Sequence, residues 1–313
     1  MQPLVSIITP AYNAENYLDA FFSSVLKQDY QNYEMIFVND GSTDETGAIA
    51  NRYGSILRSR GHRFVYLEQP NGGQAKALNL GFPYIKGKYF IWPDCDDILC
   101  NDNLSTKIAF MESHPRCALG ISSAVHVNED GDILGTFKRE PRAEDNLFRD
   151  LLTSTNVYFC PGIYILKTEA FRECYPDMKI DESRAGQNYQ LLLPVSYSFE
   201  YGYIDRVLYR YVLHPSSHSN AGADSEAVQL SRFCKHEKLL CKLVKQFCTP
   251  KDRDQYLHLV NAHFQSLYLR IANRFCDRKM AFQAMQSLFD LRSAGLKDVV
   301  YAFATFVGIS LRR

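Results

Sequence analysis

Four short apolar runs alternate with helical patterns over the first hundred residues, and this alternation constrains the fold more than any other feature. The apolar runs cover residues 4–9, 33–39, 64–67 and 89–92, and the helical patterns between them cover 14–28, 44–53 and 73–84. Strands that alternate with helices predict a parallel sheet with crossover helices on its faces. We therefore expect an α/β, Rossmann-like fold with a mostly parallel central sheet.

The pattern changes twice further along the chain. After about Asn101 it predicts a helix over 104–112, strands over 119–127 and 133–138, and a helical stretch over 143–152. After about Ser225 it predicts only helices. A segment rich in Ser, Gly, Ala and Asn at 215–225 is the predicted linker. We expect a domain over 1–220, with a nucleotide-binding half (1–100) and an acceptor-side half (101–220), and a helical C-terminal extension over 221–313.

Charge is distributed unevenly, although the formal net charge of the 313 residues is zero. Residues 225–313 hold fifteen Lys or Arg against seven Asp or Glu, and residues 1–224 hold twenty against twenty-eight. A neutral chain argues against nucleic acid as a partner, because a basic face is its usual footprint. The acidic part suits carboxylates around a metal, and the basic extension predicts contact with anionic lipid or an anionic acceptor. Solvated helix faces are the alternative.

The cysteines and the apolar C-terminal run bear on location. Nine cysteines without CxxC spacing, and an opening without a signal-peptide pattern, predict reduced thiols in a cytoplasmic protein. Cys234, Cys241 and Cys248 recur every seven residues, which favours one helix face over a metal site. The apolar run 299–311 is shorter than the roughly 20 residues that span a bilayer. We expect it to be a buried terminal helix, with an interfacial membrane helix as the alternative.

An acidic motif follows the fourth predicted strand directly: Asp94-Cys95-Asp96-Asp97. Carboxylates two residues apart at a strand end can bind one divalent cation, and hard oxygen ligands suit Mg²⁺ or Mn²⁺ bridging a diphosphate. Such a cation would neutralise charge on a departing diphosphate. The alternative is that these acids solvate a turn or cap the next helix.

Three further motifs follow the other predicted strands, at the edge where open α/β sheets bind ligands. Tyr12 offers a ring that can stack on a base, beside an Asn13 that can cap a helix. Asp40 can accept a hydrogen bond from the imide of a uracil-type base. Gly72, in the turn before Lys76, allows close approach of a nucleotide or phosphate. Each motif also has a bland interpretation as a strand-to-helix turn.

Together the four motifs resemble the inverting family 2 glycosyltransferases. The matching segments are residues 5–13 (VSIITPAYN), 38–44 (VNDGSTD), 71–79 (NGGQAKALN) and 94–97 (DCDD). The resemblance implies a GT-A fold with a UDP-type donor and a divalent metal. In it Tyr12 stacks on the base, Asp40 holds the base, and Asp94 and Asp96 serve the ribose and the metal. The implied donor-binding set is Thr9, Pro10, Tyr12, Asn13, Asp40, Gly72, Lys76 and Asp94, and the implied metal set is Asp96 and His218.

The sequence departs from the family at two positions. Leu78 precedes Asn79 where the family usually has Arg. Gln187 and Asn188 stand where the family usually has Glu-Asp, whose Asp is the general base. Neither amide takes a proton at neutral pH, and a general base contributes roughly 10² to 10⁴ in rate. Three explanations stay open: Asp181 or Glu182 is the base, the acceptor needs none, or the enzyme is weak or inactive. His214 is a second histidine in the Ser-rich segment of His218.

The predicted function is inverting transfer of a hexosyl or N-acetylhexosaminyl group from a nucleotide-diphosphate sugar to a glycan or lipid-linked acceptor. This would serve polysaccharide or cell-surface glycan synthesis in the cytoplasm, with peripheral contact at the inner face of the membrane through the basic extension. A catalytically weak or inactive nucleotide-sugar-binding module is the alternative. A sugar-phosphate nucleotidyltransferase would place a basic, Gly-rich loop after the first strand, where residues 10–13 read PAYN.

Overall fold

The computed structural model describes residues 2–140, 142, 144–184, 186–214 and 225–311. The chain divides into two compact units. The first comprises Met1–Leu147 and Asn156–His214, and the second comprises Phe148–Thr155 and Pro215–Arg313. Residues 215–224 are not described, so His218 and all of the predicted linker except Ser225 lie outside the described residues.

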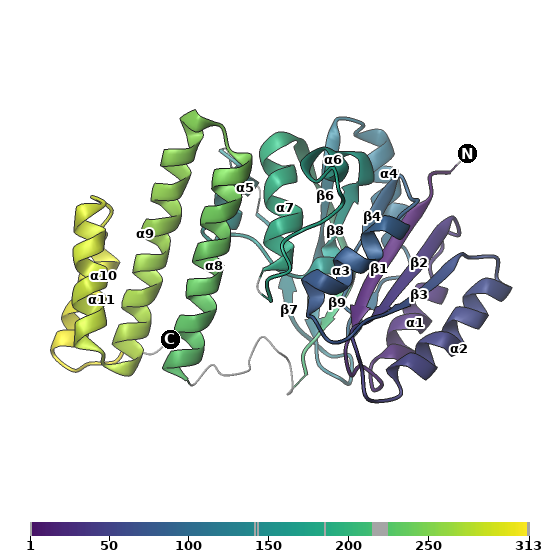
Figure 1. The fold of residues 1–313 in the computed structure, drawn as a ribbon, viewed down its shortest axis with the longest axis horizontal. Coiled ribbons are helices and arrows are strands. Elements are labelled where there is room, and N and C mark those ends of the chain that lie inside the picture. The colour runs from purple at the N-terminus through teal and green to yellow at the C-terminus, as the bar shows by residue number, and fades with distance from the viewer. Residues whose placement is uncertain (1, 141, 143, 185, 215–224, 312–313) are drawn as a thin grey trace. The chain divides into compact units, whose positions relative to one another are not determined.

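The first unit contains the predicted parallel strands. They are β1 (Val5–Ala11), β2 (Tyr33–Asn39), β3 (Phe64–Glu68) and β4 (Tyr89–Ile91), in the spatial order β3-β2-β1-β4. The connecting helices are α1 (Leu18–Leu26), α2 (Thr46–Ser59) and α3 (Gln74–Gly81), followed by the 3₁₀ turn η1 (Phe82–Tyr84). Every residue of β1, β2 and β4 is buried, as expected for strands covered on both faces (Figure 1). This half confirms the predicted α/β fold.

The sheet continues past β4 through strands that the sequence predicts only in part. Its order is β3-β2-β1-β4-β8-β6-β9-β5, with β7 paired to β6. These strands are β5 (Ile98–Leu99), β6 (Cys117–Val127), β7 (Ile133–Phe137), β8 (Tyr164–Lys167) and β9 (Glu200–Val212). β6 and β9 are parallel, whereas β8 is antiparallel to both of its neighbours. Longer parallel ladders outweigh the short antiparallel ones, so the sheet is mostly parallel.

Helices α4 (Asn103–Ser113), α6 (Thr168–Cys174) and α7 (Gln187–Ser198) complete this unit, with the 3₁₀ turn η2 (Pro161–Ile163) before β8. α7 begins after Gly186, whose φ of 67° lies in the left-handed region that glycine adopts at little cost. The chain therefore turns sharply into α7 at the Gln187-Asn188 pair, and Asn188 is buried there.

The second unit is helical, as predicted for the C-terminal extension. It contains α8 (Glu226–Phe247), α9 (Pro250–Phe275), α10 (Arg278–Asp290) and α11 (Leu296–Phe306), and all but the first residue of α5 (Leu147–Leu152). The Phe148 ring packs 4.8 Å from the Tyr256 ring of α9. Residues 148–155, which the sequence analysis placed in the acceptor-side half, therefore belong to this helical unit.

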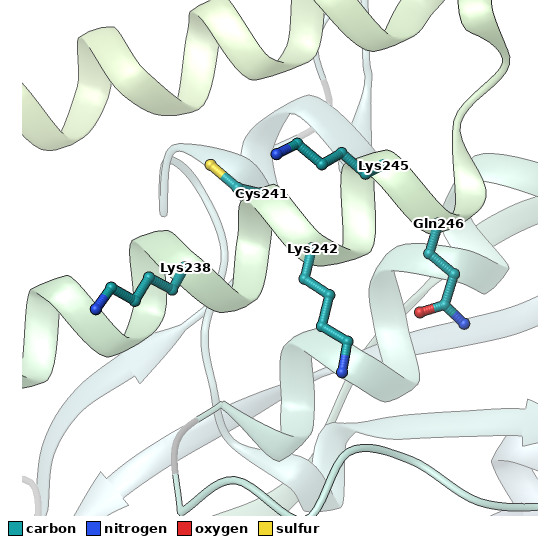
Figure 2. A pocket seen from close by; sticks show the side chains of 5 residues that line it. All are labelled: Lys238, Cys241, Lys242, Lys245 and Gln246. Carbon is teal, nitrogen blue, oxygen red and sulfur yellow. The ribbon is translucent and has the colours of Figure 1, made fainter.

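The helical unit has a pocket whose five lining residues all belong to α8. They are Lys238, Cys241, Lys242, Lys245 and Gln246 (Figure 2). The Cys241 thiol contacts Asn261 Oδ1 of α9 at 3.8 Å. Cys248, which follows α8, is buried. For Cys241 and Cys248 the spacing thus reflects helix packing, as the sequence analysis predicts.

The expectation that residues 299–311 are buried is wrong. In α11 most of the large apolar side chains are exposed, with Leu296 at 82% and Phe303 at 67%. The residues that face the unit are Asp298, Ala302, Ala304 and Thr305, with Tyr301 partly buried against the core cluster. Periodicity along the sequence gives a helix with an apolar face, but it does not say which face meets the core.

A buried carboxylate joins β2 to the segment before β4. Glu34 accepts hydrogen bonds from the Ser6 hydroxyl at 2.5 Å and the Lys86 amide at 2.7 Å, and pairs with Arg63. We predict that Glu34→Ala lowers the free energy of unfolding by about 3 kcal/mol, because it leaves buried donors unsatisfied. Arg52→Ala breaks the exposed pair with Asp19 and should cost under about 1 kcal/mol.

Urea unfolding followed by Trp92 fluorescence measures both variants, because Trp92 is the single tryptophan and lies in the first unit. Equal losses for Glu34→Ala and Arg52→Ala would contradict the predicted role of the buried carboxylate.

Candidate active site

Three carboxylates meet just beyond the end of β4. Asp94, Asp96 and Asp97 each offer an oxygen, and these oxygens lie within 4.8 Å of one another. Asp94 and Asp96 are half-buried, whereas Asp97 is buried. Within the described ranges, this is the one group of His, Cys, Asp and Glu side chains with the spacing of a metal site. The structure thus brings together the acids that the sequence predicts for metal and donor binding.

Asp97 anchors the motif to the core. Its Oδ1 accepts a hydrogen bond from the Val212 amide at the end of β9, at 2.8 Å. Its Oδ2 and the Tyr209 hydroxyl are both buried without a hydrogen bond of normal geometry. Burial raises the pKa of Asp97 well above its usual value.

The cluster suits a divalent cation. Burial, and then the Asp96 charge, raises the pKa of Asp94 to about 8. Three neighbouring carboxylates in a partly desolvated site repel one another, and a Mg²⁺ or Mn²⁺ ion relieves that repulsion through hard oxygen ligands. The buried Asp97 Oδ2 supplies an oxygen that is otherwise unsatisfied. These donors fit the predicted metal, with Asp94 and Asp96 as the accessible pair.

His214 lies against the acidic motif. It is buried, its Nε2 is 3.4 Å from the Asp96 carbonyl oxygen, and its Nδ1 is 3.1 Å from Glu129 Oε1. Its ring also packs 4.2 Å from the Tyr17 ring. His218, the histidine predicted as a metal ligand, lies outside the described residues and stays a prediction. His214 is the described histidine that the fold delivers to this place.

Asp40 holds the glycine loop that precedes α3. Its two carboxylate oxygens accept hydrogen bonds from the Gly72 amide at 2.9 Å, the Gly73 amide at 2.7 Å and the Gln69 side chain at 2.6 Å. Gly73 has a φ of 89°, a conformation that other residues rarely adopt. These three hydrogen bonds to the buried Asp40 carboxylate fix the shape of the loop. The predicted contact of Asp40 with a base is not tested by these bonds.

The first and second motifs are joined by Asn13. Its backbone adopts a φ of 47°, its amide donates to the Ser42 hydroxyl at 3.0 Å, and its Oδ1 accepts from the Thr43 amide at 2.9 Å. Tyr12, the preceding residue, is 46% exposed, so its ring is free to contact a ligand face.

Three other predicted donor residues differ in their accessibility. Thr9 and Pro10 are buried within β1, and the Thr9 hydroxyl has no hydrogen-bond partner. Their side chains consequently do not reach the surface in this conformation. Lys76 is exposed, and its aliphatic chain lies against Gly72, where an added Cβ would come within 2.3 Å of it.

The start of α7 is hydrogen-bonded to the donor-side motifs. The Gln187 amide donates to Gln74 Oε1, and the Gln74 amide donates to Asp94 Oδ1 at 3.1 Å. Nearby, the Arg184 guanidinium donates to Asn71 Oδ1 at 2.9 Å. The Gln187–Gln74 pair and the Arg184–Asn71 pair each join residues that are 113 positions apart in the chain. The sequence analysis did not predict either hydrogen bond. The unusual Gln187 was the available signal.

Asn79 makes a second connection between the same segments. Its side-chain amide donates to the Ile180 carbonyl, and its Oδ1 accepts from the Ile180 amide, both at 2.8 Å. The residue after Leu78 therefore fixes the backbone immediately before Asp181. This contact gives the third motif a structural role whether or not a polar side chain precedes Asn79.

The three predicted catalytic residues have different surroundings. Asn188 is buried, and its Oδ1 accepts a hydrogen bond from the Trp92 indole at 2.9 Å. Asp181 is half-buried; its backbone makes two hydrogen bonds with the Gln190 side chain, and its Oδ1 accepts from the Ser183 amide at 2.9 Å. Glu182 is exposed and pairs with Lys179 at 3.1 Å.

A mostly parallel sheet with a carboxylate cluster and a glycine loop at its edge is the arrangement of an α/β protein of the GT-A type. The Glycosyl transferase family 2 profile matches residues 6–174, more than half of the chain. The chain belongs to this family.

Curated relatives match part of the chain. An uncharacterized glycosyltransferase of Rickettsia prowazekii is 45% identical over 106 residues, which is 34% of this chain and 31% of that protein. TuaG of Bacillus subtilis, a putative teichuronic acid biosynthesis glycosyltransferase, is 38% identical over 154 residues, or 49% of this chain and 59% of that protein. The matched region thus spans less than two thirds of each relative.

Solved structures match almost the whole chain. Staphylococcus aureus TarS residues 1–349 in complex with UDP-GlcNAc gives a TM-score of 0.65 at 17% identity and covers 98% of this chain and 93% of that one. The mannosyltransferase PcManGT of Pyrobaculum calidifontis, in complex with GDP-Man and Mn²⁺, gives 0.60 at 16% identity and covers 100% and 82%. At these identities the likeness establishes the fold. None of the helices described here has the length and apolar character needed to cross a bilayer.

The acid cluster predicts pH-dependent metal binding. Because the folded chain holds a proton on Asp94 up to about pH 8, the metal-free protein should lose stability as pH rises from the acidic range towards 8. Mn²⁺ must displace that proton at lower pH, so its affinity should fall up to about tenfold per pH unit below 8.

Calorimetric titration of Mn²⁺ across this pH range measures the effect and the proton released. Asp94→Asn serves as the comparison, since it removes the titrating group, and it should bind Mn²⁺ more weakly and with less pH dependence. Equal pH dependence in both proteins would contradict the assignment of Asp94.

Proposed function

We propose that this chain transfers a sugar from a UDP-linked donor to a glycan or lipid-linked acceptor, with inversion at the anomeric carbon. The observation that carries the proposal is the acid cluster Asp94, Asp96 and Asp97 beyond β4, linked through Gln74 to the start of α7. The relatives are named as glycosyltransferases, and TarS was solved with UDP-GlcNAc, which supports a nucleotide-sugar donor of the hexosyl or N-acetylhexosaminyl type.

The donor nucleotide would lie along the edge formed by the first three motifs. The exposed Tyr12 ring stacks on the base. Asp40 keeps the loop around Gly72 closely folded and, at the base, accepts from the imide. The Lys76 ammonium, being exposed, approaches the phosphates or the sugar.

Asp94 and Asp96 would serve the adjoining ribose and the divalent metal, and His218 stays the predicted histidine ligand. When bound, Mn²⁺ or Mg²⁺ neutralises negative charge on the departing diphosphate. Gln74 holds the Asp94 carboxylate in place, and the half-buried setting limits competing water around both acids.

We assign the general base to Asp181. Asn188 carries no titratable proton, and its oxygen already accepts from Trp92, so the standard family role cannot fall on it. Asp181 is held by Gln190 through two backbone hydrogen bonds, whereas Glu182 is exposed and paired with Lys179. A fixed carboxylate suits proton removal from an acceptor hydroxyl better than a solvated one.

The relatives support a proposed biological setting. TuaG is named for teichuronic acid biosynthesis, which favours cell-envelope polysaccharide synthesis for this chain. A cytoplasmic protein at the inner face of the membrane has access to a nucleotide sugar on one side and a lipid-linked acceptor on the other. The basic helical unit is the part suited to that surface.

A second function is favoured by one observation, the buried amide of Asn188 in place of a base. In this alternative the chain binds a nucleotide sugar and transfers nothing. Donor binding without hydrolysis or transfer, with every acceptor tested, would support the binding module over the enzyme.

The metal assignment predicts a large kinetic effect. Asp96→Asn should lower kcat/KM by about a thousandfold or more, because the leaving diphosphate loses its Lewis acid. Asp19→Asn, which changes an exposed carboxylate on α1, is the matched control and should keep wild-type turnover. Circular dichroism checks that both variants are folded. Wild-type turnover by Asp96→Asn would refute the assignment.

The base assignment predicts a different kinetic signature. Asp181→Asn should lower kcat by roughly 10² to 10⁴ and remove the acidic limb of the pH profile, while the donor dissociation constant is unchanged. Glu182→Gln should keep kcat close to wild type. If Glu182→Gln loses activity and Asp181→Asn retains it, Glu182 is the base and our assignment is wrong.

A further inference from the structure

Helix α11 turns its large apolar side chains outward. Leu296, Val299, Val300, Phe303 and Phe306 are all exposed, and their spacing places them on one side of the helix. Tyr301 packs partly buried against the core of the unit, and the buried residues of α11 are small or polar. A soluble helix normally buries such a stripe, so this arrangement points to a surface that is covered by something else.

Helix α10 also has exposed apolar side chains. Phe282 and Phe289 lie seven residues apart, on one side of the helix, and both are more than half exposed. The two helices share one core cluster that includes Ala284, Leu288 and Ala302, which fixes them as neighbours. We call the exposed apolar residues of α10 and α11 the apolar face; its members are Phe282, Phe289, Leu296, Val299, Val300, Phe303 and Phe306.

Exposed cations accompany the apolar face. Arg278 and Lys279 open α10, Arg292 lies between the helices, and Lys297 lies in the first turn of α11; all four are exposed. Asp290 is the exposed acid of the same stretch, while Asp298 is buried and accepts from the Gly295 amide. Large apolar side chains with surrounding Lys and Arg are the composition of an interfacial membrane helix.

We propose that the apolar face docks on an anionic lipid surface, with α11 lying in the plane of the interface. The proposal stands on the helical unit alone and extends the proposed function by naming the residues that enter the lipid. An α-helix of this length is roughly 16 Å long, about half the hydrocarbon thickness of a bilayer, so it cannot span one.

Charge favours lipid over a second copy of the chain. A two-fold interface between copies would bring the same patch together with itself, so that both copies would contribute the four cations Arg278, Lys279, Arg292 and Lys297 to one interface. Like charges at a desolvated rim disfavour such an interface. Anionic headgroups complement these cations instead, and each cation near the surface should strengthen binding about fivefold.

Co-sedimentation of the full chain with vesicles tests the proposal. Vesicles of phosphatidylcholine alone are compared with vesicles that also contain phosphatidylglycerol, at low and high salt. We expect binding to the anionic vesicles that weakens with salt. The double variant Val300→Glu with Phe303→Glu should lose at least about tenfold in partitioning, because two apolar side chains no longer enter the lipid.

Val228→Glu is the matched control, since Val228 is an exposed apolar residue on α8 and should leave binding unchanged. Lys279→Gln with Lys297→Gln should weaken binding only to anionic vesicles. A Phe303→Trp variant should show a blue-shifted emission on adding vesicles, because the natural Trp92 is buried in the other unit.

Wild-type vesicle binding by the double glutamate variant would overturn the proposal. So would a concentration-dependent dimer that the same variant abolishes, with no vesicle binding by the wild type, since the occupant would then be a second copy. Transfer to a water-soluble acceptor separates this test from the proposed function: loss of vesicle binding with transfer intact refutes only the docking surface.

Discussion

The repulsion among three carboxylates at the end of β4 is the constraint on which the rest of the site depends. The sheet forces Asp94, Asp96 and Asp97 together, and burial raises the pKa of Asp94 and Asp97 instead of letting them relax into water. Such an arrangement costs stability in the metal-free chain. Under the proposed function, a divalent cation would convert that cost into binding free energy.

The remaining contacts fix the position and orientation of these carboxylates. Asp97 ties it to the last residue of β9, and Gln74 ties Asp94 to the start of α7. Asp40 shapes the loop that leads into Gln74 at the start of α3, and Gln74 in turn donates to Asp94. The start of α7 is thus connected to Asp94 by neutral amides through Gln187 and Gln74, while Asn188 accepts a hydrogen bond from Trp92.

The sequence predicts the first half of this structure well, because its information is local. Strands buried on both faces are continuous apolar runs, and the turn residues after them mark the ligand edge. It predicts β8 and β9 poorly, since a four-residue strand and a strand containing Glu200, Asp205 and Arg206 are stabilised by distant partners. The link between Gln187 and Gln74 joins residues far apart in sequence, which no local pattern reports. The exposure of the apolar residues of α11 was not predicted, because the periodicity of a sequence shows that a helix has an apolar face but not whether that face meets the core or the solvent.

The central claim is that the acid cluster, with a metal, binds a nucleotide diphosphate. Melting temperatures of the whole chain with UDP, GDP, CDP and dTDP, each with Mn²⁺ or with a chelator, test it most directly. A ligand at a hundredfold excess over its dissociation constant stabilises the native state by about 2.7 kcal/mol, a shift of several degrees. We predict a shift with UDP that requires Mn²⁺ and disappears in Asp96→Asn. No shift with any nucleotide, or one that persists with chelator and in Asp96→Asn, would contradict the account.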